Sequence, residues 1–430
     1  MATLSAGKIV AEYMGKAMET FESQDTMLSK VKLIKDAKPA DLQNAGNVIW
    51  RRVQQHGVSQ SGFDLTGLEQ GIVSQMYPAT LGTPEGNLLS LRVDDLRDIS
   101  YVRDQAVIDG EKRASVLNKS IIDVILNTGS MAFRSNATSG YDFVATAQAA
   151  MNKRQGRSVN RYMMLTDSLV NKYGKDLAGR QTLMQGNQPD KTFREGDLYP
   201  RIAGFDILRS SSIGALAGGA NPATTVTANV SLAPRSGSVD PITKVVTNYD
   251  YRTSDSIPVT ASASYNVGDR VTFSNGGTTV KAVGRDDKTV SDEAMTFVIV
   301  SKPDATHIEV WPRPIAADDP GLTTVEKAYA NINTRILSAA TVDRVNIDAS
   351  TNPALFWQQD SIEVYGGEVP MEILAQFGGM KVAKERLSNG LWFYVLYDAN
   401  IANVSATWRQ FIWYGVNNAR PADNGIGIAY

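Results

Sequence analysis

The side chains that most often carry out chemistry are scarce in this sequence. It has no cysteine and two histidines, His56 and His307, neither of which has a second metal-type ligand at a recognisable spacing. Cysteine nucleophiles, disulfides and thiolate zinc sites are therefore excluded, and a histidine-based triad or zinc site is not expected. Adjacent carboxylates occur at 94–95, 286–287 and 318–319. Because neighbouring residues in a helix or strand point apart, capping and solvation explain these pairs better than acid–base catalysis.

Motifs that bind phosphates or nucleic acids are also missing. The sequence contains neither a GxxxxGK[ST] loop nor a strand–GxGxxG–helix unit. Its densest basic cluster, formed by Lys153, Arg154, Arg157 and Arg161, has no interleaved aromatic residues, so a solvated helix face is the better interpretation. A net charge of −2 provides no overall field that would attract DNA or an anionic membrane. We therefore expect no catalytic site, no metal, no cofactor and no enzyme activity.

The length and hydropathy of the chain indicate a soluble protein of several domains. A chain of 430 residues can form two or three domains, each with its own core. No apolar run approaches the ~20 residues that span a bilayer, and the N-terminus lacks the charged-then-apolar pattern of a signal peptide. The absence of cysteine suits a reducing cytosol. We expect an intracellular protein with no membrane partner.

The longest periodic stretch runs from Asp94 to Gly129 and predicts one continuous helix. Apolar residues recur along it at helical spacing, while charged residues such as Asp109 fall on other faces. Aspartates near its start suit a helix N-terminus, and Gly129 suits a C-terminal cap. Roughly 30 residues at about 1.5 Å each form a rod of ~45 Å, which we interpret as the spine of an elongated domain. Gly110 weakens this helix by about 1 kcal/mol relative to alanine and is interpreted as the site of a bend.

Two segments that precede this helix need support from elsewhere. Residues 1–28 predict an amphipathic helix that is barely stable alone and needs a surface to lie on. Residues 47–82 predict a long two-stranded hairpin with a glycine-rich tip. A hairpin of that length has far more edge than core, so contact with partner subunits is expected to stabilise it.

The rest of the chain alternates between mixed α/β and β-rich segments. Helices are predicted at 141–155 and 167–177, and strands at 161–165 and 201–210. From about residue 220 to 314 the chain is rich in Thr, Val, Ser and Gly, and six short alternating runs predict a small antiparallel barrel or sandwich. Because α/β sequence resumes afterwards, this domain is interpreted as an insertion. Residues 346–430 are strand-rich, and their tryptophans, Trp357, Trp392, Trp408 and Trp413, are interpreted as core residues.

This order of elements resembles the major capsid proteins of tailed bacteriophages, which have the HK-97 fold. Several runs resemble more closely the coat-protein family of the short-tailed Salmonella phage P-22. They are IW at 49–50, GFDLT at 62–66, VDDLRD at 93–98, IAGFDILRS at 202–210, THIEVWPRPIAADD at 306–319, KAYANINT at 327–334 and WYGVNNARPADNGIGI at 413–428. The resemblance covers almost the whole chain and is poorest in the N-terminal arm, in residues 130–200 and in the loop at 234–256.

The resemblance implies an α+β fold of the HK-97 type with an inserted antiparallel β-barrel domain. The implied parts are an N-terminal arm (1–46), an extended loop (47–82), a peripheral domain with the spine helix (83–130), the first part of an axial domain (131–221), the inserted β-barrel domain (222–345), an axial and peripheral return (346–400) and C-terminal strands of the peripheral domain (401–430).

The implied function is that of a structural protein. Members of this family assemble as hexamers and pentamers into an icosahedral procapsid and then a mature shell around double-stranded DNA. The implied partners are further copies of the chain, a scaffolding protein, a portal protein at one vertex, packaged DNA held by weak non-specific contacts, and decoration or tail proteins. The implied location is the virion, after assembly in the cytoplasm of a host bacterium. Covalent crosslinking of subunits is not expected.

Three groups of residues are expected to make contacts between molecules. The long polar loop resembles the loop that contacts a neighbouring capsomer across local two-fold axes, and its mixed charges suit reciprocal ion pairs between identical copies. The inter-capsomer candidates are Arg235, Asp240, Lys244, Asp250, Arg252 and Asp255. The extended-loop candidates are Arg51, Arg52, Phe63, Asp64 and Glu69. The candidates for contact with a basic scaffolding protein are Glu12, Glu19 and Glu22.

Two other classes of function, an adhesive protein and an enzyme, are the alternatives to a capsid protein. A glycan-binding or adhesive protein could use the β-domain as its binding module, which would explain the Thr/Ser-rich strands but neither the spine helix nor the hairpin. An enzyme that uses carboxylates alone is the third possibility. Monomers that bind glycan and never assemble would favour the adhesive protein over the capsid protein.

Overall fold

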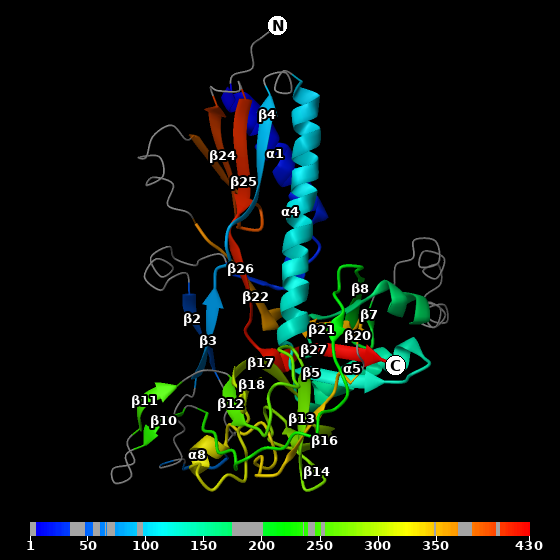
Figure 1. Cartoon of the computed structure of the whole chain (residues 1–430), viewed down its shortest axis with the longest axis vertical. Coiled ribbons are helices and arrows are strands. Elements are labelled where there is room, and N and C mark those ends of the chain that lie inside the picture. The colour runs from blue at the N-terminus through cyan, green and yellow to red at the C-terminus, as the bar shows by residue number, and fades with distance from the viewer. Residues whose placement is uncertain are drawn as a thin grey trace. The chain divides into compact units, whose positions relative to one another are not determined.

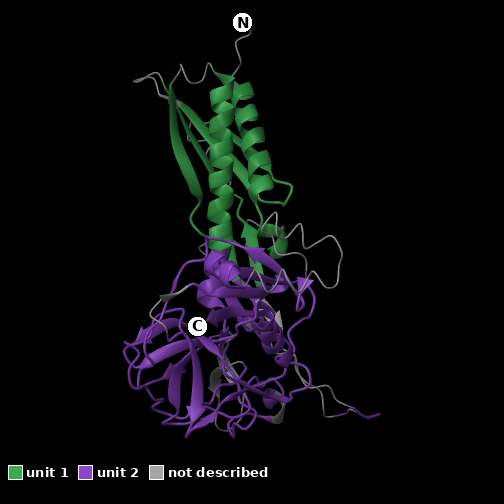
Figure 2. Cartoon of the chain, turned by 90° about the vertical axis from the view of Figure 1, so that its right-hand side faces the viewer, with its two compact units in different colours: residues 1–49, 78–121, 362–417 green, residues 50–77, 122–361, 418–430 purple. Residues whose placement is uncertain are grey.

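The computed structural model describes residues 6–34, 48–54, 61–64, 66, 74–92, 98–173, 201–234, 236–239, 246–250, 254–347, 350–368, 381–400 and 405–430. The chain forms two compact units, which Figure 2 colours separately. Unit 1 comprises Met1–Ile49, Pro78–Ile121 and Ile362–Asn417, and unit 2 comprises Trp50–Tyr77, Ile122–Ser361 and Asn418–Tyr430. Each unit is therefore assembled from segments that lie far apart in the sequence.

The long helices that the sequence predicts are confirmed, with small differences at their ends (Figure 1). They are α1 (Ala6–Gln24), α4 (Ile99–Thr128) and α5 (Gly140–Lys153). Helix α4 has 30 residues and ends immediately before Gly129, whose N–H donates to the Ile125 carbonyl at 3.0 Å. Residues 167–173 are helical, as predicted, after the strand β6 (Arg161–Leu165). The aspartates at 94–95 lie outside the described residues.

Unit 1 contains an antiparallel sheet in the order β23-β24-β25-β4. Its strands are β4 (Glu85–Arg92), β23 (Lys381–Arg386), β24 (Trp392–Asn400) and β25 (Ser405–Ile412). A second sheet has the order β1-β22-β26, with β1 (Lys32–Ile34), β22 (Ile362–Gly366) and β26 (Tyr414–Asn418). The short helix η1 (Leu28–Lys30) precedes β1. Trp408 is buried, as predicted for a core residue, whereas Trp392 and Trp413 are half-buried.

Helix α1 lies against α4 within unit 1, which is the surface that its sequence requires. Val102 and Ala106 of α4 and Ala17 of α1 are fully buried. Tyr13 of α1 donates its hydroxyl to Asp109 Oδ2 of α4 at 2.6 Å, and its ring packs edge-on against Trp408. Asp109 is 1% exposed, so this charged residue outside the apolar stripe of α4 is buried as well.

Gly110 has a packing role in α4. A Cβ atom at this position would lie 2.6 Å from the Ala17 carbonyl oxygen and 3.2 Å from the Phe21 nitrogen, both in the backbone of α1. Only glycine allows the two helix backbones to approach this closely. This approach explains a helix-weakening residue in the middle of α4 without a bend.

The predicted hairpin at 47–82 contains β2 (Val48–Gln54) and β3 (Ser74–Thr80), which form a two-stranded sheet. Two further two-stranded sheets are β10 (Ser236–Val239) with β11 (Val246–Asp250), and β9 (Leu216–Ala217) with β20 (Ser350–Thr351). Both of these pairs are antiparallel.

Unit 2 contains a six-stranded sheet, called here the core sheet, in the order β5-β27-β21-β6-β8-β7. Its strands are β5 (Met131–Ser135), β6, β7 (Arg201–Ile202), β8 (Phe205–Arg209), β21 (Ala354–Gln358) and β27 (Asn424–Ala429). Strand β27 pairs parallel with β5 and antiparallel with β21, so the last strand of the chain lies inside the sheet. Phe143, Val144 and Met151 of α5 are fully buried in one apolar cluster with Phe356 of β21.

The β-rich region, residues 222–345, has its own apolar core in unit 2. A six-stranded sheet follows the order β12-β18-β17-β13-β14, with β19 also paired to β13. The elements are β12 (Asp255–Pro258), β13 (Arg270–Asn275), β14 (Thr278–Thr279), β15 (Lys281–Val283), β16 (Val290–Ala294), β17 (Phe297–Asp304), β18 (His307–Trp311), α8 (Thr324–Lys327) and β19 (Thr341–Arg344). Strands β15 and β16 form a separate antiparallel pair. The antiparallel strands are confirmed, and closure into a barrel stays a prediction.

The compact units group the C-terminal residues differently from the expected ranges. Residues 401–430 were expected to belong together, but the unit boundary falls between Asn417 and Asn418. The physical reason is pairing: β25 and β26 join the sheets of unit 1, whereas β27, after the short helix η3 (Pro421–Asp423), joins the core sheet.

We predict that Gly110→Ala destabilises the protein although alanine is the better helix former. The added Cβ collides with the backbone of α1, and overpacking of this kind costs about 1–3 kcal/mol. Gly15→Ala is the matched control, because a Cβ on this exposed residue of α1 meets no atom within 4 Å. The control is expected to gain about 0.5–1 kcal/mol. Urea unfolding measures both, and equal stabilisation by the two variants would contradict the packing role.

We predict that Tyr13 makes the free energy of unfolding fall as the pH rises in the alkaline range. Burial, and then the hydrogen bond to Asp109, raise the pKa of Tyr13 far above its usual value. Its contribution is therefore complete below about pH 10, the unfolded pKa, and is lost as the pH rises further, because only the unfolded chain releases the proton. The expected slope is about −1.4 kcal/mol per pH unit. Urea unfolding of Tyr13→Phe should show a slope shallower by this amount, and parallel profiles for the two proteins would refute the prediction.

Candidate functional sites: assembly surfaces and a buried polar network

The acidic residues of α1 are exposed, but each has a partner within unit 1. Glu12 accepts from Arg103 Nε of α4 at 2.7 Å, and Glu19 pairs with Lys16 at 2.8 Å. Glu22 Oε1 accepts from the Ser388 backbone N–H at 2.6 Å. Exposed ion pairs of this kind contribute about 0–1 kcal/mol. A basic partner could therefore replace these contacts at little cost in free energy.

The described part of the extended-loop candidates includes one bare aromatic side chain. Phe63 is fully exposed, at 115% of the reference area. The next residue, Asp64, accepts from both the N–H and the hydroxyl of Thr66 at 2.9 and 2.6 Å, which closes a tight turn and lowers the pKa of Asp64. Arg51 in β2 is half-buried. The side chain of Arg52 and the whole of Glu69 lie outside the described residues.

The inter-capsomer candidates are only partly described. In the backbone of the β10–β11 pair, Asp250 lies opposite Ser236. Asp255, at the start of β12, forms an ion pair with Arg313 Nε at 2.9 Å, and the Arg313 side chain is fully buried. Asp255 is therefore already engaged within the subunit. Arg235, Asp240, Lys244 and Arg252 lie outside the described residues.

The remaining candidate catalytic groups stabilise turns. Asp318 accepts from the Arg335 N–H and Asp319 from the Gly321 N–H, at 2.6 and 2.8 Å. His307 Nδ1 lies 2.8 Å from Asp304 Oδ2, and hydrogen bonds from His307 and then Thr306 lower the pKa of Asp304 to about 2. His56 lies outside the described residues. In the described part of the chain, no three His, Asp or Glu side chains are grouped as a metal site would require.

The basic cluster is only partly solvated: Lys153 and Arg157 are exposed, whereas Arg154 and Arg161 are buried, so the interpretation as a solvated face was wrong for these two. Arg161 is 3% exposed and donates to Asn152 Oδ1 and to the carbonyls of Arg157 and Gly156. Arg154 is 8% exposed and donates to the Thr296 hydroxyl at 2.7 Å. Burial lowers the pKa of Arg154 to about 10. Both arginines serve the internal structure of unit 2.

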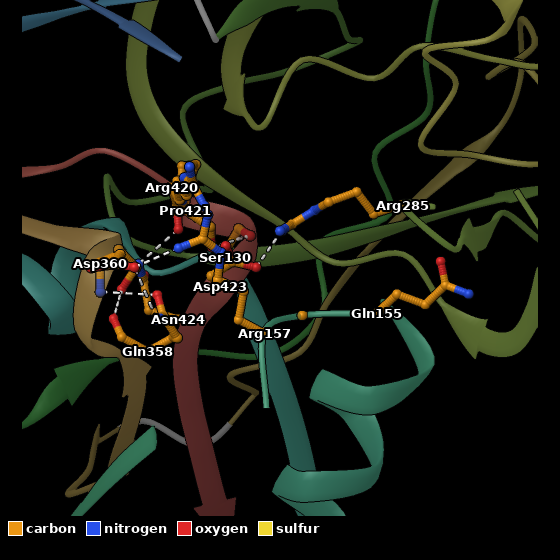
Figure 3. A network of polar contacts seen from close by, with 12 residues as sticks. Ser130, Gln155, Arg157, Arg285, Gln358, Asp360, Arg420, Pro421, Asp423 and Asn424 are labelled. Carbon is orange, nitrogen blue, oxygen red and sulfur yellow. Dashed lines mark hydrogen bonds and ion pairs between the residues drawn. The ribbon is translucent and has the colours of Figure 1, made fainter. Parts of the chain in front are cut away.

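A polar network surrounds the turn η3, which leads into β27 (Figure 3). The Pro421 carbonyl accepts from the N–H and hydroxyl of Ser130, at 3.0 and 2.6 Å. Asp423 is 1% exposed and forms an ion pair with Arg285 of the β-rich region. Asn424 and Asn418 exchange side-chain hydrogen bonds at 2.8 and 2.9 Å. The network fixes the start of β27 and joins it to the end of α4 and to the β-rich region.

A second part of this network lies on the surface beside η2 (Gln359–Ser361). Arg157 Nη1 contacts Asp360 Oδ2 at 2.6 Å, and the Asp360 N–H donates to Gln358 Oε1 at 2.9 Å. No signal in the sequence identified Asp423 or Arg285 as important, because these two residues pair with each other across 138 positions of the chain. The groups present can hold structure but show no arrangement of nucleophile, base and acid. No helix in the described part of the chain combines the length and hydropathy of a membrane span.

Solved phage and phage-like capsids are similar to this chain only at low identity. The capsid of the cyanophage P-SCSP1u is 10% identical over 95% of this chain and 89% of that chain, with a TM-score of 0.44. A protein of Mycobacterium phage Che8 is 9% identical over 94% and 91%, with a TM-score of 0.42. A virus-like particle from Pyrococcus furiosus is 7% identical over 97% of both chains, with a TM-score of 0.37.

One protein-family model matches almost the whole chain. The model of the P-22 coat protein family, described as gene protein 5, matches residues 1–429. That match covers both compact units, the hairpin at 47–82 and the β-rich region at 222–345. The chain therefore belongs to the P-22 coat protein family and is a major capsid protein, a subunit of an icosahedral phage head.

Proposed function

We propose that this coat protein assembles as hexamers and pentamers, first into a procapsid and then into a mature head around double-stranded DNA. The observation that carries the proposal is the family match over residues 1–429. Assembly takes place in the cytoplasm of the host bacterium, with a scaffolding protein inside the shell and a portal protein at one vertex. DNA makes weak, non-specific contacts, since the net charge is −2. Decoration or tail proteins bind the finished head.

The expected division into parts carries over into this proposal. Residues 1–46 form the N-terminal arm, 47–82 the extended loop, 83–130 with the C-terminal strands the peripheral domain, 131–221 with 346–400 the axial domain, and 222–345 an inserted β-barrel. The antiparallel β12–β19 sheet with its own apolar core supports the last assignment. The grouping of β27 with the core sheet supports moving residues 418–430 to the axial part.

The extended loop is proposed to contact a neighbouring subunit through Phe63. An aromatic side chain at 115% exposure is not packed against any of the described residues. Burying such a ring against a neighbour contributes about 1.5–3 kcal/mol. Arg51, Arg52, Asp64 and Glu69 would surround this contact. The glycan-binding alternative has no comparable support, because the family match assigns the chain to coat proteins.

We predict that shells form only when the chain is co-expressed with its scaffolding protein. We also predict that Phe63→Ser reduces the yield of shells about tenfold or more, because about 1.5–3 kcal/mol is lost at each contact. Sedimentation and negative-stain electron microscopy measure the yield. Phe63→Leu should retain most of it, since an apolar group remains. The melting temperature of the monomer should not change in either variant. Monomers alone under all conditions would refute assembly, whereas normal shells from Phe63→Ser would refute the contact only.

The loop at 234–256 is proposed to make reciprocal ion pairs with its copy across a local two-fold axis. The charges proposed for these pairs are Arg235, Asp240, Lys244, Asp250 and Arg252, whereas Asp255 is engaged with Arg313. In a two-fold contact each pair occurs twice, so one charge reversal places two repulsive pairs in one interface.

We predict that Arg252→Glu lowers the yield of shells and that low salt makes the defect worse, because screening weakens repulsion between charges. Light scattering during assembly at two ionic strengths measures both effects. Arg209→Glu is the control, since Arg209 pairs with Asp167 within unit 2. An unchanged yield for Arg252→Glu would exclude a reciprocal pair at this residue.

A further inference from the structure

Helix α5 ends in a turn that normally requires glycine. The Gly156 N–H donates to the Met151 carbonyl at 2.9 Å, and the Gln155 N–H to the Asn152 carbonyl at 2.8 Å. This pattern is the Schellman motif, whose residue after the cap adopts a left-handed conformation. Here that residue is Gln155, with φ of 55°. Glycine would fit this position without strain, so the glutamine side chain needs an explanation.

The Gln155 side chain reaches a turn of the β-rich region. Its Oε1 accepts from the backbone N–H groups of Asp286 and Asp287, at 2.6 and 3.1 Å. Hydrogen bonds from Thr289 and then from Gln155 also lower the pKa of the Asp287 carboxyl group. Figure 3 shows Gln155 at the end of α5, next to the network that contains Arg285.

Gly284 provides the space for this contact. A Cβ atom there would lie 2.9 Å from Gln155 Cδ, 3.0 Å from Gln155 Oε1 and 2.7 Å from Asp287 Oδ1. The φ of Gly284 is not in the left-handed region, so glycine is needed here for space and not for backbone conformation. Gln155 and Gly284, which are 129 residues apart (284 minus 155), therefore fit each other: Gln155 supplies the amide, and Gly284 has no side chain that would occupy its place.

The two residues before Gln155 contact the same stretch, residues 284–296, called here the docking segment. Lys153 Nζ lies 2.9 Å from Asp292 and 3.1 Å from Glu293 of β16. Arg154 donates to Thr296, just before β17. Lys153 at the end of α5, Arg154 at its cap and Gln155 after the cap therefore all reach this one segment.

We propose that Gln155 is a positioning residue that fixes the docking segment of the β-rich region onto the end of α5, and so holds the β-rich region in one orientation on the core sheet of unit 2. The amide of the left-handed glutamine closes the turn at 286–287, and Gly284 leaves the space for that amide. This contact lies within one subunit and does not depend on assembly. Its consequence for the shell, a uniform orientation of the inserted region in every copy, rests on the proposed function.

The test is hydrogen exchange at single-residue resolution on the purified monomer, with three variants. Gln155→Gly removes the side chain and relieves the left-handed strain. Gln155→Met keeps the size and the strain but removes the acceptor. Gly284→Ala leaves Gln155 in place but occupies the position of its amide, and only side-chain ends need to move. Lys153→Met is the comparison for loss of an exposed ion pair next to the same segment.

We expect the amides of Asp286 and Asp287 to exchange at least about tenfold faster in all three variants, because each loses its acceptor. The amides of Gln155 and Gly156, which cap α5, should keep their protection, and Lys153→Met should not accelerate exchange at 286 and 287. Unchanged exchange at these two amides in Gln155→Gly and Gly284→Ala would overturn the proposal. Because the measurement uses monomers, a failure to form shells has no effect on it.

Discussion

The buried guanidinium of Arg270 is the contact on which the arrangement of unit 2 depends. It lies at the start of β13 and donates through Nε to the carbonyl of Gly129 at 2.8 Å, immediately after α4, and through Nη1 to the Gly268 carbonyl. The side chain is fully buried, and burial lowers the pKa of Arg270 to about 9, so it keeps its charge at neutral pH. A cation at a helix C-terminus satisfies an orphan carbonyl and interacts favourably with the helix dipole. Within unit 2, the residue that follows α4 and the start of β13 therefore share one fixed point.

Buried polar pairs recur wherever segments far apart in the sequence meet. Tyr13 and Asp109 are 96 positions apart, and the Ser130 hydroxyl and the Pro421 carbonyl are 291 positions apart. Apolar contacts would tolerate small shifts of one segment along another, whereas a buried donor must meet its acceptor or lose about 1–3 kcal/mol. These pairs therefore fix the register in which the interleaved segments of each unit come together. The same reasoning applies to Gln155, whose acceptor has a defined place in the turn at 286–287.

The sequence allowed the elements to be predicted but not the partners across the fold. Periodicity located α1, α4 and α5, and Gly129 correctly marked the end of α4, because these signals are local. Arg154 and Arg161 were expected on a solvated face, since a charged residue is usually exposed unless it is paired. The partner of Arg154, Thr296, is 142 positions away and cannot be found from a local pattern, whereas Arg161 bonds to Asn152, Gly156 and Arg157 at the end of α5 and in the turn that follows it. The same limit applies to the candidate site: exposure of Phe63 and of the α1 glutamates could be inferred, but not the Arg103 and Arg313 contacts that engage Glu12 and Asp255.

The division between internal and external charges suits a protein that works in many identical copies. Inside unit 2, ion pairs such as Arg344 with Asp269, both at most 6% exposed, are shielded from salt and from competing partners. On the surface of α1, the pairs of Glu12 and Glu19 are exposed and weak. A closed shell repeats each contact between subunits many times, so no single contact has to be strong, and weak contacts let a misplaced subunit dissociate before it is trapped. The weak pairs on α1 are therefore the ones that a partner could replace, whereas the shielded pairs inside unit 2 keep their partners.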